Sequence, residues 1–331
     1  MREKILDLLS GKKIDSQPAF SGMIHVTAEG LQSEGLIFHE THKDAQKMAK
    51  AAASTFKLSG LPSAVLPLDM YVEAEALGAE INFRENMEFE FPLVRKAGFG
   101  SVKQLTAETQ SVQSFINGGR IKLVCEAIKL LKEDVGNDVV IGGMIPGPYT
   151  LLLLVVDAGK MFVEMKKEPA AVTEALFHLA SLLAQVGVDY RDAGADFITI
   201  HDMGGSPAFL GPAKYEQFVL PAEKLLIEML PKPRVLSVCG NVTNSLHLLA
   251  QTGSDAISID QTVDLATARI VLKDTLLFGN LDPVETLYRG DKAKVAESVV
   301  RAKEAGVDAV WPGCDLIIQT PIQNIQTMIK A

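Results

Sequence analysis

The chain has 331 residues, with 41 acidic and 32 basic side chains and a formal net charge of −9. A composition of 47% hydrophobic and 22% charged residues is that of an ordinary globular protein and excludes a disordered chain. The acidic balance argues against nucleic-acid binding. Three cysteines cannot build a disulfide scaffold, so we expect a reducing compartment.

Neither a membrane span nor a secretion signal is apparent in the sequence. The longest apolar run, near Leu151–Val156, ends at Asp157 and is too short to cross a bilayer. The N-terminal stretch MREKILDLLSGKK lacks the apolar region and the small-residue cleavage site of a signal peptide. We therefore expect a cytoplasmic protein with no membrane partner.

Short β-branched segments alternate with helical patterns along the chain, which predicts βαβ units and a parallel sheet. Eight segments are candidate strands, namely Ala19–Ile24, Ala64–Leu68, Asp138–Met144, Ala195–Ile200, Arg234–Val238, Ala256–Ile259, Thr275–Phe278 and Asp308–Trp311. Helical spacing is clearest in the second half, over Pro212–Leu230, Ser245–Gln251, Thr267–Lys273 and Ala293–Ala305.

This alternation predicts a TIM (β/α)8 barrel that forms a single domain over residues 1–331, with helices near the N-terminus. The stretch Gly78–Asn137 is too long for an ordinary βα connection, so we expect an insertion there between early strands. A doubly wound open sheet is the alternative. The absence of a G-x-G-x-x-G motif after a strand disfavours its dinucleotide-binding form.

Polar or reactive residues follow most of the candidate strands. In a parallel barrel the carboxyl ends of all strands open onto one mouth, so these side chains are expected to converge there. The residues concerned are Asp69, His201, Asp202, Cys239, Asp260, Asn280 and Cys314.

Cys239 and Cys314 are the strongest candidates for chemistry. Each follows a strand and has a glycine beside it, Gly240 or Gly313, which lets the backbone approach a ligand closely. Two thiolates across a barrel mouth can hold zinc when nitrogen or oxygen donors complete a tetrahedron. The alternative is that each cysteine is a small buried hydrophobic residue. Cys125 lies in a helical run at core spacing and is interpreted as structural.

His201 and Asp69 each have a functional and a structural interpretation. His201 is the only histidine at the end of a candidate strand, although a lone histidine is also a common structural residue. Asp69 precedes the helical MYVEAEALG and could cap that helix, contact a substrate, or do both. Pro148 in IPGPYTLLLL is expected in the first turn of a helix, whose free amides could receive an anion.

The combined motifs resemble one superfamily, which contains uroporphyrinogen decarboxylase and the methylcobamide:thiol methyltransferases of the coenzyme M type. The resemblance is carried by LPLDMYVEAEALGAEI, IPGPYTL, CGNVT, GNLDP, PGCD and TPIQN, in collinear order over nearly the whole chain. The family fold is a TIM barrel, in agreement with the strand pattern.

Two branches of this superfamily differ in their motifs. Decarboxylases carry arginines after the first strand and Gly-His-Gly after the last, whereas this chain has FSGMIHVTAEG and Pro-Gly-Cys at those places. The methyltransferase branch has His-x-Cys after the fifth strand and a cysteine after the eighth, and those three residues hold zinc. This sequence is therefore similar to the methyltransferase branch, with Cys239 and Cys314 as metal ligands.

The chain departs from that branch at one ligand. Ser237 stands at the histidine position, and a neutral hydroxyl is a poor zinc donor. A further mouth residue could supply the missing ligand, the candidates being His201, Asp202, Asp260 and Asp315; His201 is our choice. Otherwise zinc binds weakly or elsewhere, or is absent.

The resemblance implies methyl transfer from a methylated corrinoid, carried on a small partner protein, to a small thiol such as coenzyme M. The expected catalytic residues are Cys239, Cys314, Asp69 and His201. Asp202, Asn280, Gly240 and Gly313 are expected around the corrinoid or the substrate. A homodimer is left open, as are three other activities: methyl transfer to tetrahydrofolate without zinc, porphyrinogen decarboxylation, and a non-catalytic corrinoid-binding barrel.

Overall fold

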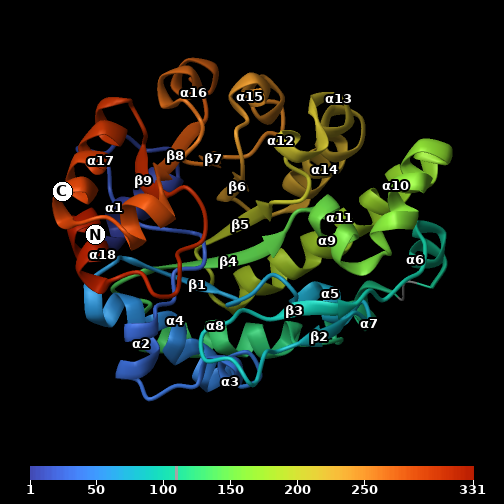
Figure 1. The fold of residues 1–331 in the computed structure, drawn as a ribbon, viewed down its shortest axis with the longest axis horizontal. Helices are drawn as coiled ribbons and strands as arrows, with labels where there is room; N and C mark the ends of the chain where they lie inside the picture. The colour runs from blue at the N-terminus through green and yellow to red at the C-terminus, as the bar shows by residue number, and fades with distance from the viewer. Residues whose placement is uncertain (109–110) are drawn as a thin grey trace.

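The computed structural model describes residues 1–108 and 111–331, and its centre is a parallel sheet (Figure 1). Seven strands are hydrogen-bonded in the order β1-β4-β5-β6-β7-β8-β9, every neighbouring pair being parallel. Their bounds are β1 Ser63–Leu66, β4 Val140–Pro146, β5 Phe197–Asp202, β6 Arg234–Val238, β7 Ala256–Ile259, β8 Leu276–Leu281 and β9 Ala309–Pro312. Seven of the eight predicted strands are thereby confirmed.

The predicted first strand, Ala19–Ile24, is reduced to a single parallel bridge between Ala19 and Val310. Beyond it, side chains rather than a neighbouring strand take the backbone amides. Ser21 N–H donates to Ser63 Oγ at 2.9 Å, and Ile24 N–H donates to Asp315 Oδ1 at 2.8 Å. The segment still lies between β9 and β1, so the sheet curls into a TIM-like barrel with a rudimentary eighth position.

Helices surround this sheet (Figure 1). Those before β4 are α1 Arg2–Leu9, α2 Ala28–Ser33, α3 Phe38–Thr41, α4 Ala45–Ser59, α5 Val72–Ala76, α6 Val102–Glu108, α7 Val112–Ile116 and α8 Ile121–Val135. Those after it are α9 Pro148–Val155, α10 Ala158–Lys167, α11 Pro169–Ala193, α12 Pro207–Leu210, α13 Pro212–Lys214, α14 Leu220–Met229, α15 Leu246–Leu249, α16 Leu265–Val271, α17 Lys292–Glu304 and α18 Ile322–Lys330. Pro148 begins α9, as predicted.

One predicted helix, Pro212–Leu230, is interrupted. A π-helical turn over Tyr215–Val219 separates α13 from α14. Pro221 lies in the first turn of α14 and has no N–H to donate to a preceding carbonyl, which accounts for the break in the regular hydrogen-bond ladder.

The core has two parts, as the alternation of side chains along a strand requires. Inward-facing residues such as Phe197, Val235 and Trp311 form a small cluster inside the barrel, whereas outward-facing residues pack against the helices. Ile5, Leu8 and Leu9 of α1 join the inner cluster, so α1 closes the amino end of the barrel.

The predicted insertion after β1 is confirmed. It contains the antiparallel pair β2 Glu80–Asn82 and β3 Leu93–Lys96, followed by α6, α7 and α8. The last of these helices returns to the barrel and packs on α4.

One helix, α11, is long and apolar enough to cross a membrane by length and composition alone. It packs against α14, α9 and β4, and 56% of its most apolar window is buried inside the fold. Its apolar character is therefore used for packing within the barrel.

Candidate active site

Three side chains from three different strand ends meet at the carboxyl end of the barrel. His201 is the second-to-last residue of β5, Cys239 follows β6 and Cys314 follows β9. The His201 Nε2–Cys239 Sγ and Cys239 Sγ–Cys314 Sγ distances are both 3.3 Å. All three donor atoms lie within 4.8 Å of one another. The structure therefore brings together residues that are 38 and 75 positions apart in sequence.

Strand register explains this convergence. His201 pairs with Ser237 across β5 and β6, so the two residues lie at the same level of the barrel. Phe197 and Val235 belong to the inner core, and alternation then directs His201, Ser237 and Cys239 toward the interior. Ser237 is buried beside the cluster, and it stands where the resemblance expects an imidazole.

The carboxylate of Asp315 faces the other ring nitrogen of His201. Asp315 Oδ2 lies 3.9 Å from His201 Nδ1, and Asp315 Oδ1 accepts the hydrogen bond from the Ile24 amide. Burial alone would lower the pKa of His201, but the charges of Asp315 and Cys314 raise it to about 9. Burial also raises the pKa of Asp315, to about 6.

The two thiols share one negative charge. A hydrogen bond from Cys239 lowers the pKa of Cys314, and His201 lowers it further. That same hydrogen bond and burial raise the pKa of Cys239. The cluster therefore favours a thiolate on Cys314, an anionic donor for a metal ion, and metal binding would displace the proton from the ligating nitrogen of His201.

These residues fit a zinc ion. Two sulfur donors and one imidazole nitrogen form a common zinc ligand set, and a site with three protein ligands leaves a position for a substrate. Zn–S bonds of about 2.3 Å place two thiolates of a tetrahedral site roughly 3.8 Å apart, close to the Cys239–Cys314 separation. Cys239 and His201 are buried, whereas Cys314 is half-buried.

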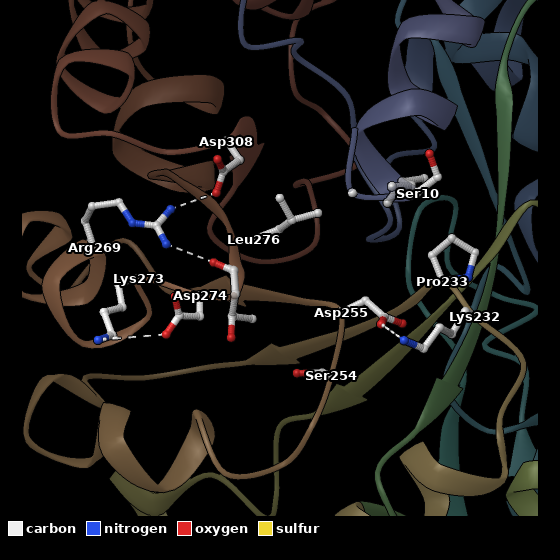
Figure 2. A pocket seen from close by; sticks show the side chains of 13 residues that line it. Ser10, Lys232, Pro233, Ser254, Asp255, Arg269, Lys273, Asp274, Leu276 and Asp308 are labelled. Carbon is white, nitrogen blue, oxygen red and sulfur yellow. Dashed lines mark hydrogen bonds and ion pairs between the residues drawn. The ribbon is translucent and has the colours of Figure 1, made fainter. Parts of the chain in front are cut away.

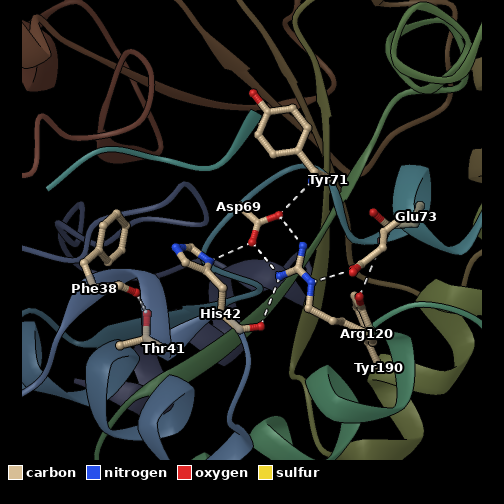
Figure 3. A network of polar contacts seen from close by, with 9 residues as sticks. Phe38, Thr41, His42, Asp69, Tyr71, Glu73, Arg120 and Tyr190 are labelled. Atoms are coloured by element: carbon tan, nitrogen blue, oxygen red, sulfur yellow. Dashed lines mark hydrogen bonds and ion pairs between the residues drawn. The ribbon is translucent and has the colours of Figure 1, made fainter. Parts of the chain in front are cut away.

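Asp69 is not part of this cluster. It is buried and accepts hydrogen bonds from Arg120 Nη1 at 2.8 Å and Nη2 at 3.1 Å, and it contacts His42 Nδ1 at 2.7 Å (Figure 3). Arg120 also donates to Glu75 at 2.6 Å. The predicted helix cap is wrong, because α5 begins after Tyr71 and Asp69 instead accepts the Tyr71 amide at 2.9 Å.

Charge explains why Asp69 remains ionised in that buried network. Burial alone would raise its pKa, but Arg120 and the hydrogen bond from His42 hold the pKa well below its usual range. For nearby Glu73 the effect of burial is larger than that of Arg120, and it raises the pKa of Glu73 to about 8. Tyr190 Oη donates to Glu73 at 3.4 Å (Figure 3). No sequence pattern marks Arg120, because it lies 51 residues from its partner Asp69.

Asp202 follows His201 but points to the other side of β5. Its Oδ1 accepts hydrogen bonds from Thr150 Oγ1 at 2.5 Å and from the Gly205 amide at 3.0 Å. Burial raises the pKa of the Glu223 carboxyl well above its usual value, and the nearby charge of Asp202 raises it further. Asp202 thus fixes the loop after β5 against α9, and Thr150 and Glu223 are partners that the sequence did not indicate.

Asn280, in strand β8, holds the loop that follows β7. Its amide donates to the carbonyls of Asp260 at 3.1 Å and Val263 at 3.0 Å. Asp260 is itself occupied, since its carboxylate accepts hydrogen bonds from Gly240 N–H and from the amide and hydroxyl of Thr262. Of the four candidates for the missing ligand, His201 is the one whose donor atom lies close to the sulfur atoms of both Cys239 and Cys314.

The two glycines beside the cysteines are needed for close approach. Gly240 has φ of +85°, and a Cβ there would lie 2.8 Å from Ala208 Cβ. A Cβ on Gly313 would lie 2.6 Å from the backbone nitrogen of Gln261. Both glycines therefore let neighbouring loops pack closely around the cysteines. Gly240 N–H also donates a hydrogen bond to the carboxylate of Asp260.

A groove of about 730 Å³ lies at the opposite, amino end of the barrel (Figure 2). Its charged side chains pair with one another, as in Arg269–Asp308 at 2.7 Å and Lys232–Asp255 at 3.3 Å. The groove lies before β6, β7, β8 and β9 and is remote from the cysteines, so it does not serve the candidate site.

Comparison with known proteins gives the family. The family model described as uroporphyrinogen decarboxylase (URO-D) matches residues 1–331. The chain belongs to the uroporphyrinogen decarboxylase family. Within it the chain is 32% identical to the methylcobamide:CoM methyltransferase MtbA of Methanosarcina acetivorans, over 99% of this chain and 96% of that protein. It is 27% identical to the uroporphyrinogen decarboxylase of Citrifermentans bemidjiense, over 86% and 83%.

A solved structure confirms the fold. A methyltransferase from Methanosarcina mazei superposes with a TM-score of 0.94 at 28% identity, covering 99% of this chain and 97% of that one. The expected TIM barrel and the expected place beside the methyltransferases of the family are both confirmed.

Proposed function

We propose that the protein is a corrinoid-dependent methyltransferase that moves a methyl group from a methylated corrinoid to a thiol of the coenzyme M type. The observation that carries the proposal is the cluster of Cys239, Cys314 and His201, whose donor atoms lie within 4.8 Å of one another at the barrel mouth. Full-length similarity to methylcobamide:CoM methyltransferases supports it.

The cluster would hold zinc through Cys239 Sγ, Cys314 Sγ and His201 Nε2. Bound zinc lowers the pKa of a coordinated thiol, so that the substrate sulfur is a thiolate at neutral pH. The chain's own contribution is to hold two sulfur donors beside the substrate position and to keep Cys239 out of water. Both effects leave charge on the substrate sulfur and favour its attack on an electrophile.

In the methyl transfer, one bond forms as another breaks. The substrate thiol releases its proton to solvent, its sulfur attacks the methyl carbon, and a C–S bond forms as the Co–C bond breaks. The electron pair of that bond stays on cobalt, which passes from cobalt(III) to cobalt(I).

The rim of the mouth suits a broad apolar macrocycle. Met203, on the loop after β5, and Phe209, on helix α12 of the same connection, are 43% and 66% exposed. Phe209 packs next to Gly240, one residue from Cys239. We infer that this loop meets the corrinoid as a small carrier protein presents it. The insertion at 78–137 is a second candidate contact, and a carrier pull-down that survives its deletion would exclude it.

The proposal also places the protein in the cytoplasm. All three cysteines are free thiols, and two of them must remain reduced for the cluster to bind a metal.

The test is a side-by-side assay of methylcobalamin demethylation with coenzyme M and with tetrahydrofolate, followed by cobalamin absorbance. We expect turnover with the thiol only, lost in Cys239→Ala and in Cys314→Ala. Cys125→Ala is the matched control, because Cys125 lies half-buried on α8 away from the cluster, and it should retain activity. Turnover with the folate alone, or full activity in both cluster variants, would overturn the proposal.

A further inference from the structure

The cluster takes its nitrogen donor from a different strand than the resemblance predicts. Ser237 on β6 occupies the expected histidine position, and His201 on β5 is its register partner. Neighbouring strands lie about 4.8 Å apart, and both side chains face the barrel interior at the same level. An imidazole on either strand can therefore reach the sulfurs of Cys239 and Cys314.

The ring of His201 has a defined orientation. Its Nε2 faces Cys239 Sγ at 3.3 Å, while its Nδ1 faces Asp315 Oδ2 at 3.9 Å. His201 is fully buried, and Nδ1 has no hydrogen-bond partner among the residues that the structure describes. The carboxylate of Asp315 is thus the group placed to hold a proton on Nδ1 and leave Nε2 free as a donor.

Asp315 is itself held in place. Its Oδ1 accepts the Ile24 amide at 2.8 Å, which leaves Oδ2 to face the imidazole. It also follows Cys314 directly, so one loop supplies both a sulfur donor and the carboxylate behind the histidine. Metal-binding histidines usually donate their second ring N–H to such a carboxylate, which fixes the tautomer and raises the basicity of the ligand.

We propose that Asp315 is a positioning residue that makes Nε2 of His201 the metal-binding atom, and that this pair supplies from β5 the nitrogen ligand that β6 lacks. The inference rests on the proposed function insofar as it takes the cluster to bind a metal. It goes further in naming the group that orients the ligand and the strand position that could replace it.

The test is titration of the metal-free, full-length protein with Co²⁺ and Zn²⁺. Absorption spectra of the cobalt form report thiolate ligation and coordination number, independently of turnover. We expect Asp315→Asn to weaken metal affinity by about 10- to 100-fold while the thiolate-to-cobalt band persists. His201→Ala should weaken affinity more than Asp315→Asn does. Asp264→Asn, which removes a carboxylate cap from exposed helix α16, is the matched control and should leave affinity unchanged.

A rescue experiment distinguishes a positioning role of Asp315 from direct metal ligation by Asp315 and from general damage to the fold. Adding Ser237→His to His201→Ala should restore affinity, because the imidazole then comes from the neighbouring strand. In that double variant Asp315→Asn should no longer weaken binding, because its partner His201 is gone. Circular dichroism of each variant checks that the barrel is folded.

The outcomes are distinct. Unchanged affinity in Asp315→Asn, or an equal loss in the His201→Ala/Ser237→His background, would overturn the inference. Failure of the proposed function would look different, since Cys239→Ala and Cys314→Ala would then leave metal affinity intact.

Discussion

Asp69 lies at the end of β1, where a catalytic carboxylate is expected, yet both of its oxygens are bonded to Arg120, and one also contacts His42. We expect Asp69→Asn to reduce the free energy of unfolding by about 3–5 kcal/mol, because the buried Arg120 charge loses its bidentate partner and keeps only Glu75. Urea denaturation measures this. The zinc content of the variant should stay that of the unmodified protein. Unchanged stability combined with lost methyl transfer would show instead that Asp69 acts in the reaction.

Glu73 gives a prediction about pH. Burial raises its pKa to about 8, whereas an unfolded chain has an ordinary value of about 4.3. Between these values the folded protein holds a proton that the unfolded chain has released, so rising pH lowers this contribution by about 1.4 kcal/mol per pH unit. Above pH 8 the contribution is constant.

Glu73→Gln has no carboxyl group at this position and so lacks the pH-dependent contribution. The free energy of unfolding of the variant, relative to that of the unmodified protein, should therefore increase as pH rises from 5 to 8. Urea midpoints at several pH values provide the measurement, and the difference between the two proteins cancels all other titrating groups. Parallel profiles would mean that Glu73 is ionised in the fold.

Residue identity at strand ends predicted part of the site and left part of it undetermined. Cys239, Cys314 and His201 could be chosen because each follows a recognisable strand, and a barrel directs strand ends to one mouth. The choice among four replacement ligands needed strand register and the side to which each residue points. The partners of Asp69 and Asp202 were not predictable, because Arg120, just before α8, and Glu223, on α14, have no motif around them.

At the scale of elements, the strand pattern predicted seven strands and the insertion, and the bounds differ by a few residues. The first strand was overestimated, because Ser21 and Ile24 find side-chain partners that a sequence pattern does not reveal. The role of α1 was also not foreseen. It is held at the amino end of the barrel by Arg2, which pairs with Asp196 at 2.7 Å.

We expect α1 to act as a structural plug. Ile5 is fully buried in the inner core, so Ile5→Ala should cost about 2–5 kcal/mol through lost burial and a residual cavity. Ile270→Ala on α16 is the control, because Ile270 is 75% exposed and should change stability by less than about 0.5 kcal/mol. Thermal or urea unfolding of the two variants tests this, and equal effects would refute the plug.

In the molecule as a whole, residues that stabilise the fold and residues of the candidate site lie at opposite ends of the barrel. Helix α1 and paired charges close the amino end, while the sulfur cluster and the exposed rim of Met203 and Phe209 lie at the carboxyl end. This arrangement lets a bulky methyl donor approach one end without disturbing the closure of the other. A metal ion held by the cluster would be the link between the fold and the proposed reaction.

The most direct test of that link is anomalous X-ray scattering at the zinc edge from crystals of the zinc-treated protein. We predict a single strong peak at the barrel mouth, bonded to Cys239 Sγ, Cys314 Sγ and His201 Nε2. An absence of density between these atoms, or a zinc ion bound without both sulfurs, would contradict the account.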